Sequence, residues 1–201
     1  MKRTLNSLIL AALLSQLIVP NAFAACTQGG QCGVQGSCNS YQYLYDYNFA
    51  ETCSPLPWLR YSTPAATFVT SNGPDMCNGF YQSYVQLNYN SGQPSEISQD
   101  TTIASNESRT HWTAGWNISI TDPNQDSTNS LVIQVWDMTA NTLLGQSNFY
   151  YGDDVDPDCR ADVLSLGTHN LAGHVIRVAI IGNIYYTNTH FYLTNVGLYA
   201  S

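Results

Sequence analysis

The stretch HWTAGWNISI, residues 111–120, decides the fold class. Apolar side chains occupy every second position, from Trp112 through Trp116 to Ile120, and mostly small or polar side chains lie between them. Because successive side chains of a β-strand point to opposite faces, this alternation predicts a strand with one buried face. We expect Trp112 and Trp116 to belong to the core.

The segments on either side of this stretch indicate further short strands. Two of them, 131–138 and 174–181, are rich in apolar and β-branched residues, which is typical of central strands. The other candidates are 41–47, 65–70, 80–88, 96–103, 142–151, 162–166 and 190–199. Gly, Pro and Asn punctuate the chain between them, as turns require. The sequence therefore predicts an all-β protein whose residues 41–201 form one two-sheet antiparallel sandwich.

The first 24 residues have the pattern of a secretory signal peptide. Lys2 and Arg3 precede an apolar stretch at 8–19, and the small-residue site Ala22-Phe23-Ala24 follows. The apolar stretch is shorter than the roughly 20 residues that span a bilayer. We expect an exported protein without an integral membrane segment, secreted from the cell or, alternatively, held in the periplasm.

All six cysteines follow the signal: Cys26, Cys32, Cys38, Cys53, Cys77 and Cys159. An even number in an exported chain predicts three disulfides, whose pairing the sequence leaves open. A lipid on Cys26 is the alternative, because the residues before it loosely resemble a lipoprotein cleavage site. Residues 25–40 are rich in Gly and contain few apolar residues, so we expect a short N-terminal appendage held by disulfides.

The charge of the chain excludes two classes of partner. Charged residues make up 10% of the sequence and the formal net charge is −8, with Lys2 as the only lysine. A groove for nucleic acid and a patch that docks on anionic lipid both need clustered Lys and Arg. We therefore expect neither partner, and the amide- and hydroxyl-rich strands suit an uncharged ligand.

Eight elements between Asn48 and the C-terminus occur in an order that resembles a known fold family. They are Asn48-Phe49-Ala50-Glu51, Trp58, Gly79 to Tyr84, Glu96 to Asp100, the Trp116 strand, Val132 to Asp137, Val175 to Val178 and Phe191 to Leu198. Together they resemble the galactose-binding-like jelly roll, the β-sandwich of many bacterial carbohydrate-binding modules. The resemblance implies this fold and, less specifically, a glycan ligand.

The resemblance also implies a structural calcium ion. The family commonly holds one with a Glu after the opening Phe and an Asp in the closing strand, where this chain has Glu51 and Asn195. An amide in place of a carboxylate weakens such a site without abolishing it. The alternative is that Glu51 caps a turn.

A second candidate for a cation is the acidic loop with Asp153, Asp154, Asp156 and Asp158. Repulsion among these carboxylates requires either a bound cation or full solvation. The loop lacks the glycine and glutamate of an EF-hand.

Aromatic side chains are the better indication of function, because sugar rings stack on Trp and Tyr while amides bind their hydroxyls. The candidate carbohydrate-binding residues are Trp136, Tyr150, Tyr151, Tyr185 and Tyr186, which alternate with core positions or end strands at turns. Four tyrosines alternate within 41–47. They either pack the appendage onto the sandwich or bind ligand.

Three functions follow, in order of preference. The first is a secreted, non-catalytic module that recognises glycan by aromatic stacking and amide or hydroxyl hydrogen bonds. The alternative is a protein-interaction or adhesion module, which Tyr- and Asn-rich surfaces serve equally well. The third is a glycan-cleaving hydrolase or lyase. The chain has no nucleophile or metalloprotease motif, but a suitable pair among its carboxylates stays open. The sugar and the oligomeric state are left open.

Overall fold

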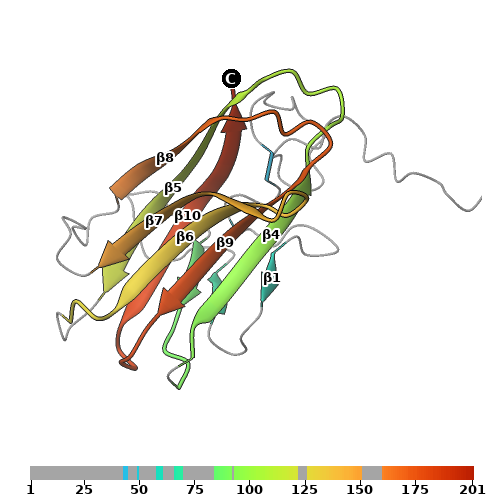
Figure 1. Ribbon diagram of the computed structural model, residues 1–201. Coiled ribbons are helices and arrows are strands. Elements are labelled where there is room, and N and C mark those ends of the chain that lie inside the picture. The colour runs from blue at the N-terminus through green and yellow to red at the C-terminus, as the bar shows by residue number, and fades with distance from the viewer. Residues whose placement is uncertain are drawn as a thin grey trace, which may run out of the picture.

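The computed structural model describes residues 43–44, 49, 58–60, 66–69, 84–91, 93–121, 126–150 and 160–201. The strands within them are β1 (Leu59–Arg60), β2 (Ala66–Val69), β3 (Tyr84–Leu87), β4 (Ser95–Thr102), β5 (His111–Thr121), β6 (Ser130–Asp137), β7 (Thr142–Tyr150), β8 (Arg160–Thr168), β9 (Val175–Asn183) and β10 (His190–Ala200). They form two five-stranded sheets, ordered β1-β4-β9-β6-β7 and β2-β3-β10-β5-β8. Figure 1 shows the sheets packed one behind the other. The predicted antiparallel jelly-roll sandwich is confirmed.

The stretch that decided the fold class is β5, which lies inside its sheet between β10 and β8. Trp112 and Trp116 are 1% and 2% exposed, so both belong to the core as expected. The opposing sheet contributes the buried apolar positions of β6 and β9, including Ile133 and Val178. Burying each side chain of this size stabilises the fold by about 1.5–3 kcal/mol.

The order of strands in the sheets differs from their order in the chain. β5 and β6 are consecutive, yet they lie in different sheets. β5 pairs with β8 and β10, whereas β6 pairs with β7 and β9. The two antiparallel sheets pack face to face, so each strand keeps one inward row of apolar residues and one outward row.

Tyr43 joins the two sheets at one end of the sandwich. Its N–H donates to the carbonyl of Leu198 in β10, and its own carbonyl accepts from the hydroxyl of Thr101 in β4, both at 2.9 Å. The ring is 4% exposed and contacts Trp112, with 5.1 Å between the ring centroids. For this tyrosine, packing against the core is therefore the correct interpretation.

Most predicted strand ranges agree with the structure to within a few residues, and two details differ. Tyr43 and Leu44 do not lie in a strand, although 41–47 was expected to be one. The two-residue strand β1 was not predicted.

Some of the predictions lie outside the described residues. They are the signal peptide, the appendage at 25–40, all six cysteines, Glu51, Tyr151 and the acidic loop with Asp153, Asp154, Asp156 and Asp158. Asn195 is described: it is half-buried in β10 with a φ of 54°, at an irregularity in the pairing with β5. Asparagine tolerates this left-handed conformation better than most residues do. The calcium site stays a prediction.

Candidate functional site

The outer face of the β1-β4-β9-β6-β7 sheet carries the candidate site. On β6, the outward positions Val132, Gln134 and Trp136 are half-buried, while the positions between them are fully buried. On β7, Tyr150, Asn148 and Gln146 are exposed and lie opposite Ser130, Val132 and Gln134. Trp136 and Tyr150, both predicted from the sequence, therefore lie on the same face.

A directional chain of hydrogen bonds crosses this face. The Trp136 indole N–H donates to Gln134 Oε1 at 2.9 Å, and Gln134 Nε2 donates to Gln146 Oε1 at 2.7 Å. Gln146 Nε2 then donates to Asn148 Oδ1 at 2.9 Å. Each amide group has two donors and two acceptor lone pairs, so these bonds use part of its capacity. We call the row of Trp136, Gln134, Gln146, Asn148 and Tyr150 the amide track.

The bonds along the amide track hold its side chains in place before any ligand arrives. Long amide side chains otherwise lose rotamer freedom on binding, at a cost of about 0.5–1.5 kcal/mol each. Gln146 and Asn148 remain exposed. They are therefore oriented donors and acceptors on the surface, able to bind hydroxyl groups without much reordering.

A pair of charged residues borders the Trp136 end of the track. Arg177 of β9 lies directly opposite Trp136 in the sheet register, and Asp100 of β4 lies directly opposite Arg177. Arg177 Nε and Nη2 donate to the two Asp100 carboxylate oxygens at 2.6 and 2.8 Å. The pair is bidentate and partly exposed, which makes the row Asp100, Arg177, Trp136 neutral overall.

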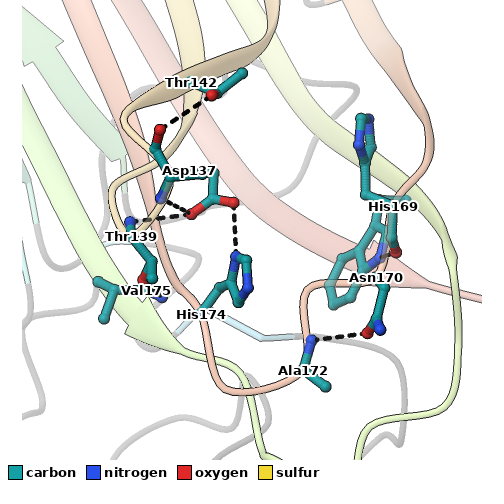
Figure 2. A network of polar contacts seen from close by, with 10 residues as sticks. Asp137, Thr139, Thr142, His169, Asn170, Ala172, His174 and Val175 are labelled. Carbon is teal, nitrogen blue, oxygen red and sulfur yellow. Dashed lines mark hydrogen bonds and ion pairs between the residues drawn. The ribbon is translucent and has the colours of Figure 1, made fainter.

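The turn that follows Trp136 is tied down by a buried carboxylate (Figure 2). Asp137 accepts the backbone N–H groups of Thr139 and Ala140, both at 3.0 Å, and the ring Nδ1 of His174 at 2.7 Å. Burial opposes the ionisation of Asp137, but these hydrogen bonds outweigh it and lower the pKa of its carboxyl. The N–H of Val175 also donates to the Thr139 hydroxyl. The backbone carrying Trp136 is thus fixed to the start of β9.

Exposed tyrosines gather at the other end of the same sheet. Tyr185 and Tyr186 follow β9, and are 55% and 41% exposed. The buried Asn129 accepts the N–H of Tyr185 at 2.8 Å, which fixes this loop to the residue before β6. Hydrogen bonds to the Asp126 carboxylate lower its pKa; the largest contribution comes from the backbone N–H of Thr128 and the next from the Tyr186 hydroxyl. Tyr150, 41% exposed, lies on β7 opposite Ser130.

The predicted aromatic residues form two groups and not one pocket. Tyr150 lies at the level of Ser130, six residues before Trp136 on β6, which corresponds to about 20 Å along an extended strand. One sugar ring cannot contact both. The structure fills the space between them with Gln134, Gln146 and Asn148, which the sequence analysis did not single out.

Three of the described histidines, His169, His174 and His190, have polar partners within the fold. His174 contacts Asp137, His169 Nε2 contacts the Leu166 carbonyl at 2.7 Å, and His190 Nδ1 contacts Asn88 Oδ1 at 2.8 Å. Burial lowers the pKa of His190. Among the residues that the structure describes, no group of three or more His, Cys, Asp or Glu side chains is arranged to hold a metal ion. In the same residues no helix is long and apolar enough to span a membrane.

Comparison with solved structures identifies the architecture. A family 61 carbohydrate-binding module in complex with β-1,4-galactotriose superimposes with a TM-score of 0.57 at 12% identity, covering 80% of this chain and 99% of the other. The chain has the jelly-roll fold of carbohydrate-binding modules. No protein-family model matches it, and no curated protein matches it in sequence.

Two similar structures are enzymes. A Stig cyclase from Fischerella, in complex with an indole compound, has a TM-score of 0.55 at 11% identity over 80% of this chain and 97% of the cyclase. An arabinose-bound α-L-arabinofuranosidase has a TM-score of 0.53 at 12% identity, over 80% of this chain and 26% of that enzyme. At these identities the likeness shows the fold, which hosts both binding and catalysis.

Proposed function

We propose that this chain is a secreted, non-catalytic carbohydrate-binding module that holds a glycan on the amide track. The observation that carries the proposal is the one-way hydrogen-bond chain from Trp136 through Gln134 and Gln146 to Asn148. It runs from the half-buried Trp136 toward the exposed Tyr150. Sugar rings present C–H faces to aromatic rings and hydroxyls to oriented amides. The secretion is supported by the signal pattern of residues 1–24.

The absence of catalysis is part of the proposal, and the roles of two described carboxylates, Glu107 and Asp137, support it. Glu107 accepts two hydrogen bonds from the Arg109 guanidinium and one from Tyr43. Asp137 is held by two backbone N–H groups and His174. Both carboxylates therefore have partners that fix them in structural roles, whereas a glycosidase needs one carboxyl that stays protonated and a second that acts as base or nucleophile.

Binding to a glycan array, followed by calorimetry on the best ligand and on β-1,4-galactotriose, tests the proposal. Trp136→Ala removes the aromatic end of the track and is expected to weaken binding about tenfold or more, as for other buried aromatic anchors. Asn117→Ala, on a strand of the other sheet, is the matched control and should leave affinity unchanged. An array without hits from folded protein, or equal losses in both variants, contradicts the proposal.

A protein partner is the second candidate, because Tyr150, Tyr185 and Tyr186 form an exposed tyrosine-rich end. Tyrosine supplies large contact area to protein surfaces at low entropic cost. Pull-downs from cell extract before and after enzymatic deglycosylation separate the two functions. Capture that survives deglycosylation and is lost in Tyr185→Ala favours the protein partner.

A further inference from the structure

The row Asp100, Arg177, Trp136 contains an arginine placed where it would contact a ligand stacked on the tryptophan. Arg177 lies opposite Trp136 on the neighbouring strand, and its side chain is 27% exposed. A guanidinium presents a planar set of donors that matches a carboxylate or sulfate in a bidentate manner. An uncompensated arginine here would favour acidic sugars such as uronates.

Asp100 already occupies that position. Its two carboxylate oxygens accept from Arg177 Nε and Nη2 at 2.6 and 2.8 Å, the same bidentate geometry that a uronate would use. An acidic ligand must therefore displace a carboxylate held in the same chain, whose effective concentration is high. Until it does, Asp100 repels it.

The surrounding charge strengthens this effect. Glu96 lies on the same face of β4, two positions from Ser98 and four from Asp100. The other arginine whose side chain is described, Arg109, is bound by Glu107. The whole chain has a net charge of −8. Acidic glycans thus meet a negative protein, and Arg177 beside the track is already paired with a carboxylate.

We propose, building on the proposed function, that Asp100 is a specificity-determining residue that restricts the amide track to uncharged glycans. Uncharged hydroxyls can bind Gln146 and Asn148 without disturbing the ion pair. The Asp100–Arg177 pair gives the face polar groups without a net charge. It discriminates against acidic glycans because their carboxylates must compete with Asp100 for Arg177, and not because of their shape.

The experiment uses two sets of oligosaccharides: hexaoses of 1,4-linked neutral hexoses, and the same chains oxidised to uronates at C6. Wild-type protein should bind the neutral chains at least about tenfold more tightly, as expected for a charge-assisted contact that is blocked. Asp100→Asn keeps the shape of the side chain but removes the negative charge that pairs with the Arg177 guanidinium. It should raise uronate affinity about tenfold with little change for neutral chains, and the gain should vanish at high salt.

Glu96→Gln is the matched control, because it removes one negative charge from the same face and strand while leaving the Arg177 pair intact. It should change the ratio of neutral to uronate affinity far less than Asp100→Asn does. Equal effects of both variants, or equal wild-type affinity for the two ligand sets, would overturn this inference alone. Folded wild-type protein that binds neither set overturns the proposed function as well. Thermal melting of each variant shows that it is folded.

Discussion

Two arginine–carboxylate pairs in this molecule use the same chemistry for different purposes. Glu107 and Arg109 lie at the end of the sandwich beside Tyr43, and the Glu107 side chain is 7% exposed. Asp100 and Arg177 lie on the outer face of a sheet, where the Asp100 side chain is 36% exposed. An ion pair withdrawn from water is costly to break, while an exposed one contributes little to stability. Burial therefore makes the first pair a structural element and leaves the second available for selectivity.

The Glu107–Arg109 pair also holds Tyr43, the residue that joins the sheets. The Tyr43 hydroxyl donates to Glu107 Oε2, and Arg109 Nη2 donates to the Tyr43 oxygen at 2.8 Å. Burial first, and then the hydrogen bond to Glu107, raise the pKa of Tyr43, so this hydroxyl stays neutral. The three side chains act as one network, so removing any member breaks hydrogen bonds made by the other two.

Glu107→Gln should have the largest effect on stability. The variant replaces the carboxylate that pairs with the Arg109 guanidinium by a neutral amide, so the charge assistance of these bonds is lost. We expect a loss of about 2–3 kcal/mol in the free energy of unfolding, measured by urea denaturation at neutral pH. A loss below about 0.5 kcal/mol would mean that the Glu107–Arg109 pair stabilises the fold no more than an exposed ion pair does, which contradicts the difference between the two pairs.

The acid dependence of stability sharpens the same contrast. The hydrogen bond from the Arg109 side chain, together with that from Tyr43, lowers the pKa of Glu107 from its ordinary 4.5 to about 2. A carboxyl whose pKa is lower in the folded state stabilises the fold fully above its unfolded pKa, and loses this contribution as the pH falls. Wild-type stability should therefore drop between pH 4.5 and about 2. In Glu107→Gln the drop should be smaller, as urea titrations across this range would show.

Asp100→Asn should have the smallest effect on stability. The exposed ion pair is expected to contribute about 0.2–1 kcal/mol, so the melting temperature should fall by a few degrees at most. The same variant is expected to change ligand preference. A large loss of stability in this variant would show that the exposed pair is structural too.

The sequence predicted the fold because the decisive information is local. Trp112, Trp116 and Ile120 lie an even number of residues apart. Because side chains of a strand alternate between two faces, this spacing places all three on the same buried face. The same rule placed Trp136 outside the core. From the turn position, one ring of the pair Tyr185 and Tyr186 was expected to point away from the core, and in the structure both are exposed.

The sequence could not predict the track itself, because the track depends on which strands become neighbours. Gln134 and Gln146 lie twelve residues apart and meet through the register of β6 with β7, whereas Asp100 and Arg177 are 77 residues apart. Such pairings are set by the burial of all strands together and not by any local pattern. The sequence indicated the track only through amides at alternate strand positions: Gln134, Gln146 and Asn148. Amides at outward positions are common on any sheet, so the signal alone was weak.

The most direct test of glycan binding on the amide track is a nuclear magnetic resonance titration of the labelled protein with the best array ligand. The side-chain amide signals of Gln134, Gln146 and Asn148 and the indole N–H signal of Trp136 should shift and saturate together. The amide signals of Asn117 and Gln86, on the other sheet, should stay in place. Shifts confined to the other sheet, or no shifts with any glycan, would contradict the account.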